Sequence, residues 1–458
     1  MILNQYHLSS LSLSSYLIGD ESTGNAVVVD PQRDIDQYLH DASRNNLTIV
    51  GVIDTHFHAD FVAGHLELAA ATGAWIGLGA RADAAYDFRK LHHGEKISLG
   101  EVELEIHETP GHTWESITVL VRERAADKTP LAALTGDTLF IGDVGRPDLA
   151  ASVGADPVEL ARALYHSVHD DLMKLDGSVR LLPAHTAGSA CGKNLSAERE
   201  STIGQQQAAN PSVQPMSEDE FVTLITSGQP SVPTYFATDA RLNRSRHPVM
   251  AGRLHPAALP TDALERALSS GARILDARPP APFAAGHLAG SINVGINGRF
   301  EETAGMFFDH RDVIVVVAEP GKEAEVQLGL ARIGCDRVVG FVPNLPDLLA
   351  AKPQLAASTD RVPAAELDST LADPETVVLD VRNAGEREEG AIPGTQHIPL
   401  AELPQRHDEL PADKRIVVHC ASGWRSSVAA SALKALGYTD VADVAGGYNA
   451  WARDHRAA

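Results

Sequence analysis

The second half of the chain repeats itself, and this repeat constrains the fold more than any other feature. Residues 274–294 (ILDARPPAPFAAGHLAGSINV) match residues 378–398 (VLDVRNAGEREEGAIPGTQHI) at a constant offset of 104 residues. Residues 313–334 match the run 415–437, in which residues 416–437 align at an offset of 103. Each copy runs from an apolar strand through a loop into a helix, so we expect two tandem α/β domains of about 100 residues each.

The two copies differ in one loop. The alignment equates Asp276 with Asp380, Arg278 with Arg382, Gly290 with Gly394, Val317 with Cys420 and Lys322 with Arg425. Only the second copy therefore carries a thiol in this loop, and the first has the acidic Glu319, which would oppose a bound anion. We expect the first copy to be catalytically silent, with a spacer or docking role.

The first ~200 residues alternate short apolar runs with turn signals and helical stretches, a pattern that predicts a layered α/β domain. The expected strands are Ser14–Ile18, Asn25–Val29, Ile49–Asp54, Val102–Ile106, Ile117–Val121, Leu131–Thr135 and Arg180–Leu182. The expected helices are Asp34–Asn45, Ala63–Thr72 and Pro157–Lys174. The stretch 205–250, rich in Gln, Pro, Ser and Asn, predicts a domain edge with one short helix (Ser217–Ser227), followed by a linker.

Composition disfavours several classes of function. A chain of 458 residues has room for roughly three domains. Its 38 basic and 61 acidic residues give a net charge of −23, so we expect no nucleic-acid partner. No run of 18 apolar residues predicts a membrane span, and the N-terminal segment lacks the pattern of a secretory signal. With only three scattered cysteines, we expect no disulfide framework and a reducing, cytoplasmic setting.

Four segments each place a residue of a metal-binding type directly after a strand-like run. The first is THFHAD (55–60), in which His56, His58 and Asp60 lie between the apolar run IVGVID and a helix. The other three are TPGHTWES with His112, LTGDTLFIGD with Asp137 and LLPAHTAGS with His185. Imidazole nitrogens and carboxylate oxygens suit a divalent transition metal. The first motif alone is also compatible with surface histidines beside a helix start, but four such segments favour a metal centre.

Together, THFHAD, PGHT, GDTLF and PAHT resemble the metallo-β-lactamase superfamily over Met1–Gln207. The resemblance implies an αββα sandwich with the metal between the sheets. Many hydrolases of this superfamily hold two metals with an HxHxDH motif, whereas this chain has Phe61 in place of the last histidine. Because a phenyl ring cannot bind a metal ion, we expect one metal rather than two.

The remaining ligand set resembles that of the persulfide dioxygenase branch. This resemblance implies that His56, His112 and Asp137 hold one Fe(II) per N-terminal domain. Two histidines and one carboxylate leave open positions on the metal, as in non-haem Fe(II) oxygenases. Three further residues then either orient ligands or substrate, or make structural hydrogen bonds only: His58, Asp60 and His185.

Longer motifs narrow the resemblance to fusions of a persulfide dioxygenase with rhodanese-like domains. These motifs are GDTLFIGDVGRPDL (136–149) and PAHTAGSACGKNLS (183–196), followed by the tandem repeat. We expect Arg146 and Lys193 to shape the mouth of the substrate pocket, with Asp148 either beside them or in a turn. Cys191, six residues past His185, is either a functional thiol near the metal or a small packing residue. The expected domains are residues 1–240 with a C-terminal linker, 255–352 without the catalytic cysteine, and 360–458.

The loop HCASGWRSS (419–427) connects the run RIVV to a helix. Backbone N–H groups at such a helix start can point at the Cys420 sulfur, and Arg425 adds a positive charge. Cys-x-x-Gly-x-Arg resembles the sulfurtransferase loop of the rhodanese family, which implies a parallel sheet in each repeat and a persulfide on Cys420. The resemblance also assigns the loop residues Ala421, Ser422, Gly423 and Trp424 and the upstream pair Asp380 and Arg382. An inert core cysteine and a phosphatase loop are the alternatives.

Both chemistries use sulfane sulfur. The resemblance implies that the first domain oxidises a small persulfide, such as glutathione persulfide, with O2 to sulfite and thiol. It also implies that Cys420 exchanges sulfur with sulfite, thiosulfate and thiols. The alternatives are a zinc-dependent thioester hydrolase resembling glyoxalase II with an accessory sulfurtransferase domain, and a non-enzymatic sulfur carrier or sensor. A homodimer or homotetramer is expected from the resemblance alone, and the sequence identifies neither the carrier thiol nor the direction of sulfur transfer.

Overall fold

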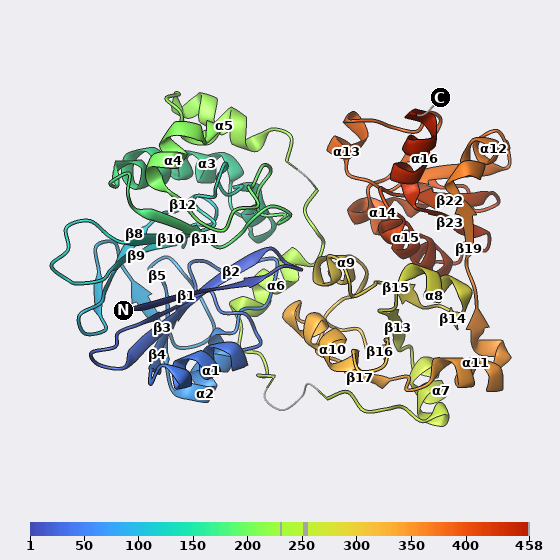
Figure 1. The fold of residues 1–458 in the computed structure, drawn as a ribbon, viewed down its shortest axis with the longest axis horizontal. Helices are drawn as coiled ribbons and strands as arrows, with labels where there is room; N and C mark the ends of the chain where they lie inside the picture. Colours follow the sequence, from blue (N-terminus) through green and yellow to red (C-terminus); the bar gives the residue numbers. More distant parts are fainter. Residues whose placement is uncertain (230, 251–254, 457–458) are drawn as a thin grey trace. The chain divides into compact units, whose positions relative to one another are not determined.

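The computed structural model describes residues 1–229, 231–250 and 255–456 (Figure 1). It divides into two compact units, the first formed by Met1–Ala251 with Ala331–Gly334 and the second by Gly252–Leu330 with Cys335–Ala458. Within the described residues, none of the helices combines the length and the apolar character needed to cross a lipid bilayer. The expected end of the third domain, residue 458, lies outside the described residues, and the domain boundaries stay a prediction.

Two six-stranded sheets form the first unit. The first sheet contains β1 (Ile2–Leu8), β2 (Leu13–Gly19), β3 (Asn25–Val29), β4 (Thr48–Ile53), β5 (Trp75–Gly79) and β6 (Arg89–Leu91), in that order. The second has the order β12-β11-β10-β9-β8-β7, with β7 (Lys96–Ser98), β8 (Glu103–Glu108), β9 (Ile117–Arg122), β10 (Ala132–Gly136), β11 (Arg180–Pro183) and β12 (Ser201–Thr202). Every strand expected from the sequence is present, whereas β1, β5, β6, β7 and β12 were not predicted.

Successive residues of one strand face different layers, as the two-residue period of a strand requires. In β3, Val27 and Val29 pack between the two sheets, whereas Ala26 and Val28 face the helices α1 (Asp36–Arg44) and α2 (His65–Thr72). The outer face of the second sheet packs against α3 (Pro157–Tyr165), α4 (Ile203–Ala209) and α5 (Glu218–Thr226). The order helix, sheet, sheet, helix is the expected αββα sandwich (Figure 1).

The stretch expected to be a linker contains a further packed helix, α6 (Phe236–Asn243). Its residues Phe236, Ala240 and Asn243 are buried. The last part of the first unit is therefore a structured segment, and one of its side chains reaches the candidate site described below.

The second unit contains the two repeats, each built on a parallel sheet as expected. The first sheet has the order β15-β13-β16-β17, with β13 (Arg273–Asp276), β15 (Ile292–Asn293), β16 (Ile314–Val317) and β17 (Val338–Phe341). The second has the order β19-β23-β22-β20-β21, with β19 (Asp360–Pro363), β20 (Thr376–Asp380), β21 (Gln396–His397), β22 (Arg415–His419) and β23 (Val441–Ala445). A short pair, β14 (His287–Leu288) and β18 (Ala356–Ala357), accompanies the first sheet.

Helices follow the strands in both repeats. The first repeat has α7 (Thr261–Ser269), α8 (Pro280–Ala285), α9 (Phe300–Phe307), α10 (Glu323–Arg332) and α11 (Leu345–Ala351). The second has α12 (Leu367–Leu371), α13 (Ala384–Glu388), α14 (Leu403–Arg406), α15 (Trp424–Ala435) and α16 (Gly447–Arg456).

The strand register corrects the sequence alignment of the two repeats by one residue. In the first repeat Asp276 pairs with Val317, and in the second Asp380 pairs with His419. The residue equivalent to Cys420 is therefore Ala318, not Val317. By the same shift, the equivalent of Arg425 is the acidic Glu323 rather than Lys322. The first repeat thus lacks the thiol and carries the opposite charge at the arginine position.

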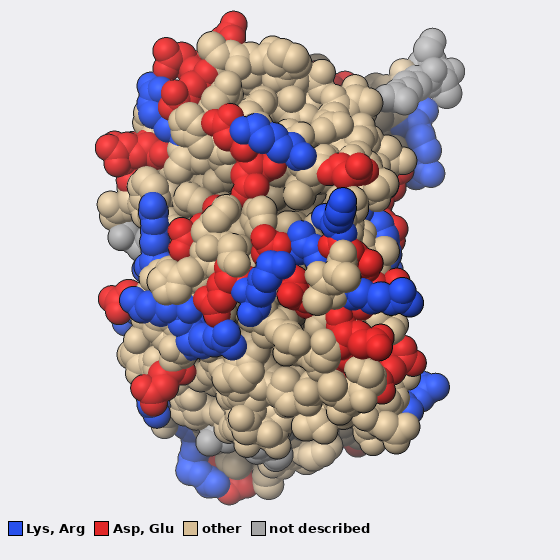
Figure 2. Space-filling model, turned by 90° about the vertical axis from the view of Figure 1, so that its left-hand side faces the viewer, with Lys and Arg blue, Asp and Glu red and all other residues tan. Residues whose placement is uncertain are grey.

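Figure 2 shows one face of the molecule with its charged side chains. Among the described residues drawn there, acidic and basic side chains are intermixed rather than gathered into one broad basic patch.

Candidate metal centre and sulfur-transfer loop

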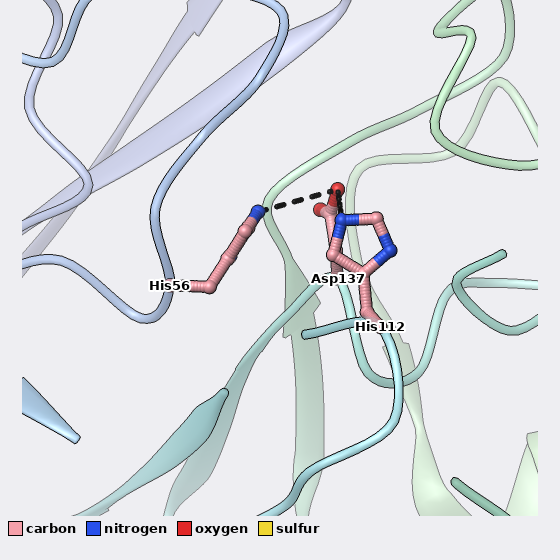
Figure 3. Close-up of side chains that lie close together, drawn as sticks. All are labelled: His56, His112 and Asp137. Atoms are coloured by element: carbon pink, nitrogen blue, oxygen red, sulfur yellow. Dashed lines mark ion pairs between the residues drawn. The ribbon is translucent and has the colours of Figure 1, made fainter. Parts of the chain in front are cut away.

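Three buried side chains from three separate loops converge at strand ends (Figure 3). His56 follows β4, His112 lies between β8 and β9, and Asp137 follows β10. The Oδ2 atom of Asp137 lies 3.7 Å from Nε2 of His56 and 3.5 Å from Nε2 of His112. One ligand-type atom from each residue lies within 4.8 Å of the others. These are the three residues singled out as ligands from the sequence.

The atoms of this triad fit a metal ion. Among the described residues, the buried atoms His56 Nε2 and Asp137 Oδ2 have no hydrogen-bond partner. The Nδ1 atom of His112 lies 3.0 Å from the carbonyl oxygen of Arg146, to which it can donate, and this leaves the lone pair of Nε2 free. Because a buried polar atom without a partner costs roughly 1–3 kcal/mol, a bound cation would stabilise this arrangement. Two imidazole nitrogens and one carboxylate oxygen suit a divalent transition metal.

His185 lies between two carboxylates and orients the triad. Its Nδ1 atom lies 2.7 Å from Oδ1 of Asp137, and its Nε2 atom lies 2.8 Å from Oδ2 of Asp60. Burial disfavours a charged ring, but the two carboxylates raise the pKa of His185 well above its ordinary value. For Asp137, burial alone would raise the pKa, but His185 and the two triad histidines bring this pKa well below its ordinary value.

His58 lies beside His56 and contacts a buried carboxylate through one ring nitrogen. Its Nε2 atom lies 3.0 Å from Oδ1 of Asp30, a carboxylate that also accepts hydrogen bonds from the backbone N–H and the hydroxyl of Thr55. The ring of Phe61 packs 4.5 Å from the His58 ring, and its side chain belongs to a small apolar cluster with Leu11. Sequence reasoning missed Asp30, although an acidic residue directly after an apolar strand was the available signal.

Helix α6 braces the loop that carries His56. The Asn243 side chain donates hydrogen bonds to the carbonyl oxygens of His58 and Phe61, both at 2.8 Å, and accepts one from the backbone N–H of Ala63 at 2.9 Å. Asn243 is fully buried. Three hydrogen bonds of the Asn243 side chain therefore close the loop, a role that the polar composition of the segment did not reveal.

Arg146 fastens the loop that carries Cys191. Its Nε and Nη2 atoms donate to Asp148 at 2.7 and 2.6 Å, and its Nη1 atom donates to the carbonyl oxygen of Ala190. Arg146 is 1% exposed. Lys193 is exposed, and its Nζ atom donates to the carbonyl oxygen of Ser227. The substrate-binding roles expected for Arg146 and Lys193 stay predictions.

The thiol of Cys191 is brought to the site. It lies in one group with Asp60 and His185, whose ligand-type atoms are within 4.8 Å of one another. Burial, followed by the negative charges of Asp60 and Asp137, raises the pKa of the Cys191 thiol well above its ordinary value. This environment favours the thiol over the thiolate.

Cys420 lies at the start of a tight loop before α15. The backbone N–H of Gly423 donates to its Sγ atom at 3.2 Å, and the Ser426 hydroxyl lies 3.7 Å from the sulfur. Gly423 has φ +97°, a conformation that an L side chain rarely adopts. The sulfur is thus held by the inward-pointing backbone that the sequence predicted.

The positive charge of Arg425 is paired. Its two terminal nitrogens donate to Glu386 at 2.7 and 2.6 Å. Glu386 also accepts from the backbone N–H of Asn383 as part of the N-cap of α13. Burial would raise the pKa of Glu386, but Arg425 brings it below its ordinary value. Glu386, like Asp30 at the metal centre, was not predicted from the sequence.

The ion pair of Asp380 and Arg382 has an equivalent in the first repeat. Arg382 donates to both oxygens of Asp380 and to the carbonyl oxygen of Gly390. The cysteine-less repeat has the same arrangement, in which Arg278 donates to Asp276. The pair therefore supports the sheet end in both repeats, and a role of Asp380 and Arg382 in sulfur transfer stays a prediction.

Residues 260–342 and residues 363–454 each match the rhodanese-like domain family. The second unit is a tandem of rhodanese-like domains. The N-terminal region has the metallo-β-lactamase-like fold. A crystal structure of a metallo-β-lactamase from Staphylococcus aureus matches with 28% identity and a TM-score of 0.67, covering 75% of this chain and 99% of that one.

The N-terminal region is similar to several curated proteins, two of which illustrate the match. A β-lactamase hydrolase-like protein of Agrobacterium fabrum is 28% identical over 240 residues, covering 46% of this chain and 52% of that protein. The match thus spans about half the length of this relative. The mitochondrial persulfide dioxygenase ETHE1 of Homo sapiens is 28% identical over 218 residues, covering 46% of this chain and 75% of that protein. The chain therefore joins a region similar to a persulfide dioxygenase with two rhodanese-like domains.

Proposed function

We propose that this protein oxidises a low-molecular-weight persulfide and passes sulfane sulfur through Cys420. In the first step, the persulfide RSSH reacts with O2 and water to give the thiol RSH, sulfite and two protons. In the second, the outer sulfur of a Cys420 persulfide moves to sulfite, so that thiosulfate forms and the Cys420 thiolate is released. Glutathione persulfide is the substrate we propose to test first.

One observation carries the first step. The triad of His56, His112 and Asp137 presents unpartnered ligand atoms, while Phe61 stands where the dinuclear hydrolases have a further histidine ligand. A single metal with open positions supports an oxygenase rather than a hydrolase that bridges water between two ions.

The residues of the chain have separate tasks in this proposal. His56, His112 and Asp137 would hold one Fe(II), which would supply the redox chemistry for O2. His185 engages Oδ1 of Asp137, so that Oδ2 faces the two histidines. Burial of these side chains excludes bulk water from the reacting groups.

Anaerobic purification, metal analysis and an oxygen electrode test the first step. We expect about one iron per chain and O2 uptake that depends on the added persulfide, with sulfite as product. Zinc in place of iron, together with hydrolysis of a glutathione thioester, would support the thioester hydrolase instead. A panel of persulfides of glutathione, coenzyme A and cysteine identifies the carrier thiol.

The second step rests on the loop geometry at Cys420. The Gly423 N–H donates to the Cys420 sulfur, and the loop holds this sulfur directly before α15. Small persulfides and thiols, O2, sulfite and thiosulfate are the partners that we propose. The cytoplasmic location and a homo-oligomeric state remain predictions from the sequence.

A further inference from the structure

The cysteine-less repeat is hydrogen-bonded to the helix that starts at the Cys420 loop. The backbone N–H of Asn293, in β15, donates to the Ser431 hydroxyl of α15 at 2.9 Å. The Oδ1 atom of Asn293 accepts from the Ser427 hydroxyl of the same helix at 2.7 Å. All three residues are buried. One residue of the first repeat therefore holds two successive turns of α15.

The Asn293 side chain is itself fixed by its own repeat. Its Nδ2 atom donates to the carbonyl oxygens of Asp276 and Arg278 at 2.9 and 2.8 Å. The amide nitrogen and oxygen thus have unambiguous positions. In the second repeat the equivalent residue is His397, whose Nε2 atom lies 2.8 Å from the carbonyl oxygen of Arg382. Asparagine keeps this link to the sheet end and adds an acceptor that reaches Ser427.

Two glycines of the same segment lie against the indole of Trp424. A Cβ atom on Gly298 would lie 2.8 Å from Cε2 and Cζ2 of Trp424, and one on Gly295 would lie 2.9 Å from its Nε1 atom. The second repeat has Pro399 at the position of Gly295. The backbone of the first repeat can therefore approach the indole only because side chains are absent there.

Trp424 lies between two residues of the sulfur-transfer loop. Gly423 precedes it and donates its N–H to Cys420 Sγ, and Arg425 follows it and pairs with Glu386. A displacement of Trp424 would therefore move both groups. Contact at this one residue links the cysteine-less repeat to the sulfur.

We propose that the cysteine-less rhodanese-like domain positions the sulfurtransferase loop of the second repeat. Asn293 holds α15, and Gly295 and Gly298 seat Trp424, so that the loop around Cys420 keeps its shape. This inference deepens the proposed function, because it rests on sulfur transfer at Cys420. It assigns a task to the repeat beyond that of a spacer.

The test compares Asn293→Ala with a control in the same repeat, in the full-length protein. The control is Asn344→Ala, which removes the N-cap of α11 and so destabilises the repeat without touching α15. The first readout is the rate at which iodoacetamide alkylates Cys420, followed by peptide mass spectrometry. The second is kcat and KM for sulfur transfer from thiosulfate to cyanide.

We expect Asn293→Ala to change the alkylation rate and kcat by roughly 3- to 10-fold relative to the control, the effect expected from loss of the buried hydrogen bond to Ser427. Ser427→Ala removes the same bond from the other side with a smaller structural change. The double variant should then differ little from Asn293→Ala alone, because that variant has already lost the bond to Ser427. O2 uptake with a persulfide should be unchanged in all of them.

Equal alkylation rates and equal kcat in Asn293→Ala, Ser427→Ala and the control would overturn the proposal. Additive effects in the double variant would also overturn it. A wild-type protein that transfers no sulfur would contradict the proposed function, whereas the alkylation rates would still decide whether Asn293 positions the loop.

Discussion

The Nδ1 atom of His185 lies 2.7 Å from Oδ1 of Asp137, and this contact leaves Oδ2 of Asp137 to face His56 and His112. A residue expected either to orient a ligand or to be purely structural therefore contacts the candidate ligand Asp137 directly. This distinction between holding a metal and orienting a ligand can be measured.

Replacing His112 with alanine should abolish iron binding, because a three-ligand site loses one of its nitrogen donors. Replacing His185 with glutamine should leave iron bound but weaken its affinity by about 10- to 100-fold, as is common when a group that orients a ligand is lost. Iron titration followed by metal analysis after gel filtration measures both. Equal loss of iron in the two variants would contradict the assigned roles.

Replacing Cys420 with serine should abolish thiosulfate formation and leave persulfide-dependent O2 uptake intact, because the two sites lie on different domains. An oxygen electrode and ion chromatography of the products measure the two activities. Cys335→Ser is the matched control, since this cysteine is also a buried thiol but lies in the other rhodanese-like domain. Loss of both activities in folded Cys420→Ser protein would refute the separation.

Replacing Asn243 with alanine should destabilise the first unit by about 1–3 kcal/mol, because it leaves two buried carbonyl oxygens and one buried N–H without their partner. Thermal unfolding by calorimetry, with and without iron, measures the loss. We also expect weaker iron binding, since the loop with His56 is no longer braced. An unchanged transition would show that water replaces the amide without penalty.

Acid should weaken the pair of Arg425 and Glu386. Burial opposes ionisation of Glu386, but Arg425 brings its folded pKa below the ordinary value of 4.5. A carboxylate with a lowered pKa contributes stability that is fully present above pH 4.5 and is lost as the pH falls through the folded pKa. Glu386→Gln should therefore lose less stability than the wild type below pH 4.5. Calorimetry across this range tests the sign, and identical pH profiles would contradict it.

The triad was predictable because each ligand motif directly follows an apolar run that forms a strand. Strand ends in a layered sandwich meet at one edge, so His112 and Asp137 were brought beside His56 by topology alone. The repeats were predictable for a similar reason, since two copies of one pattern form two similar sheets.

The supporting residues were harder to predict. Asn243 lies on a helix whose sequence is short and polar, and Asp30 has a positive φ that composition does not indicate. The register of β16 was misjudged by one residue because its run of valines gives the same pattern after a shift. Such residues depend on tertiary contacts, which local pattern does not encode.

The brace from α6 has a practical consequence for dissecting the protein. The sequence predicts a domain boundary at residue 240, and an N-terminal fragment that stops there would lack Asn243. The carbonyl oxygens of His58 and Phe61 would then lose the hydrogen bonds that Asn243 donates. Poor iron binding by such a fragment would then result from the missing Asn243 hydrogen bonds and would not show that the metal site itself is inactive. A longer fragment that includes Asn243 distinguishes these two explanations.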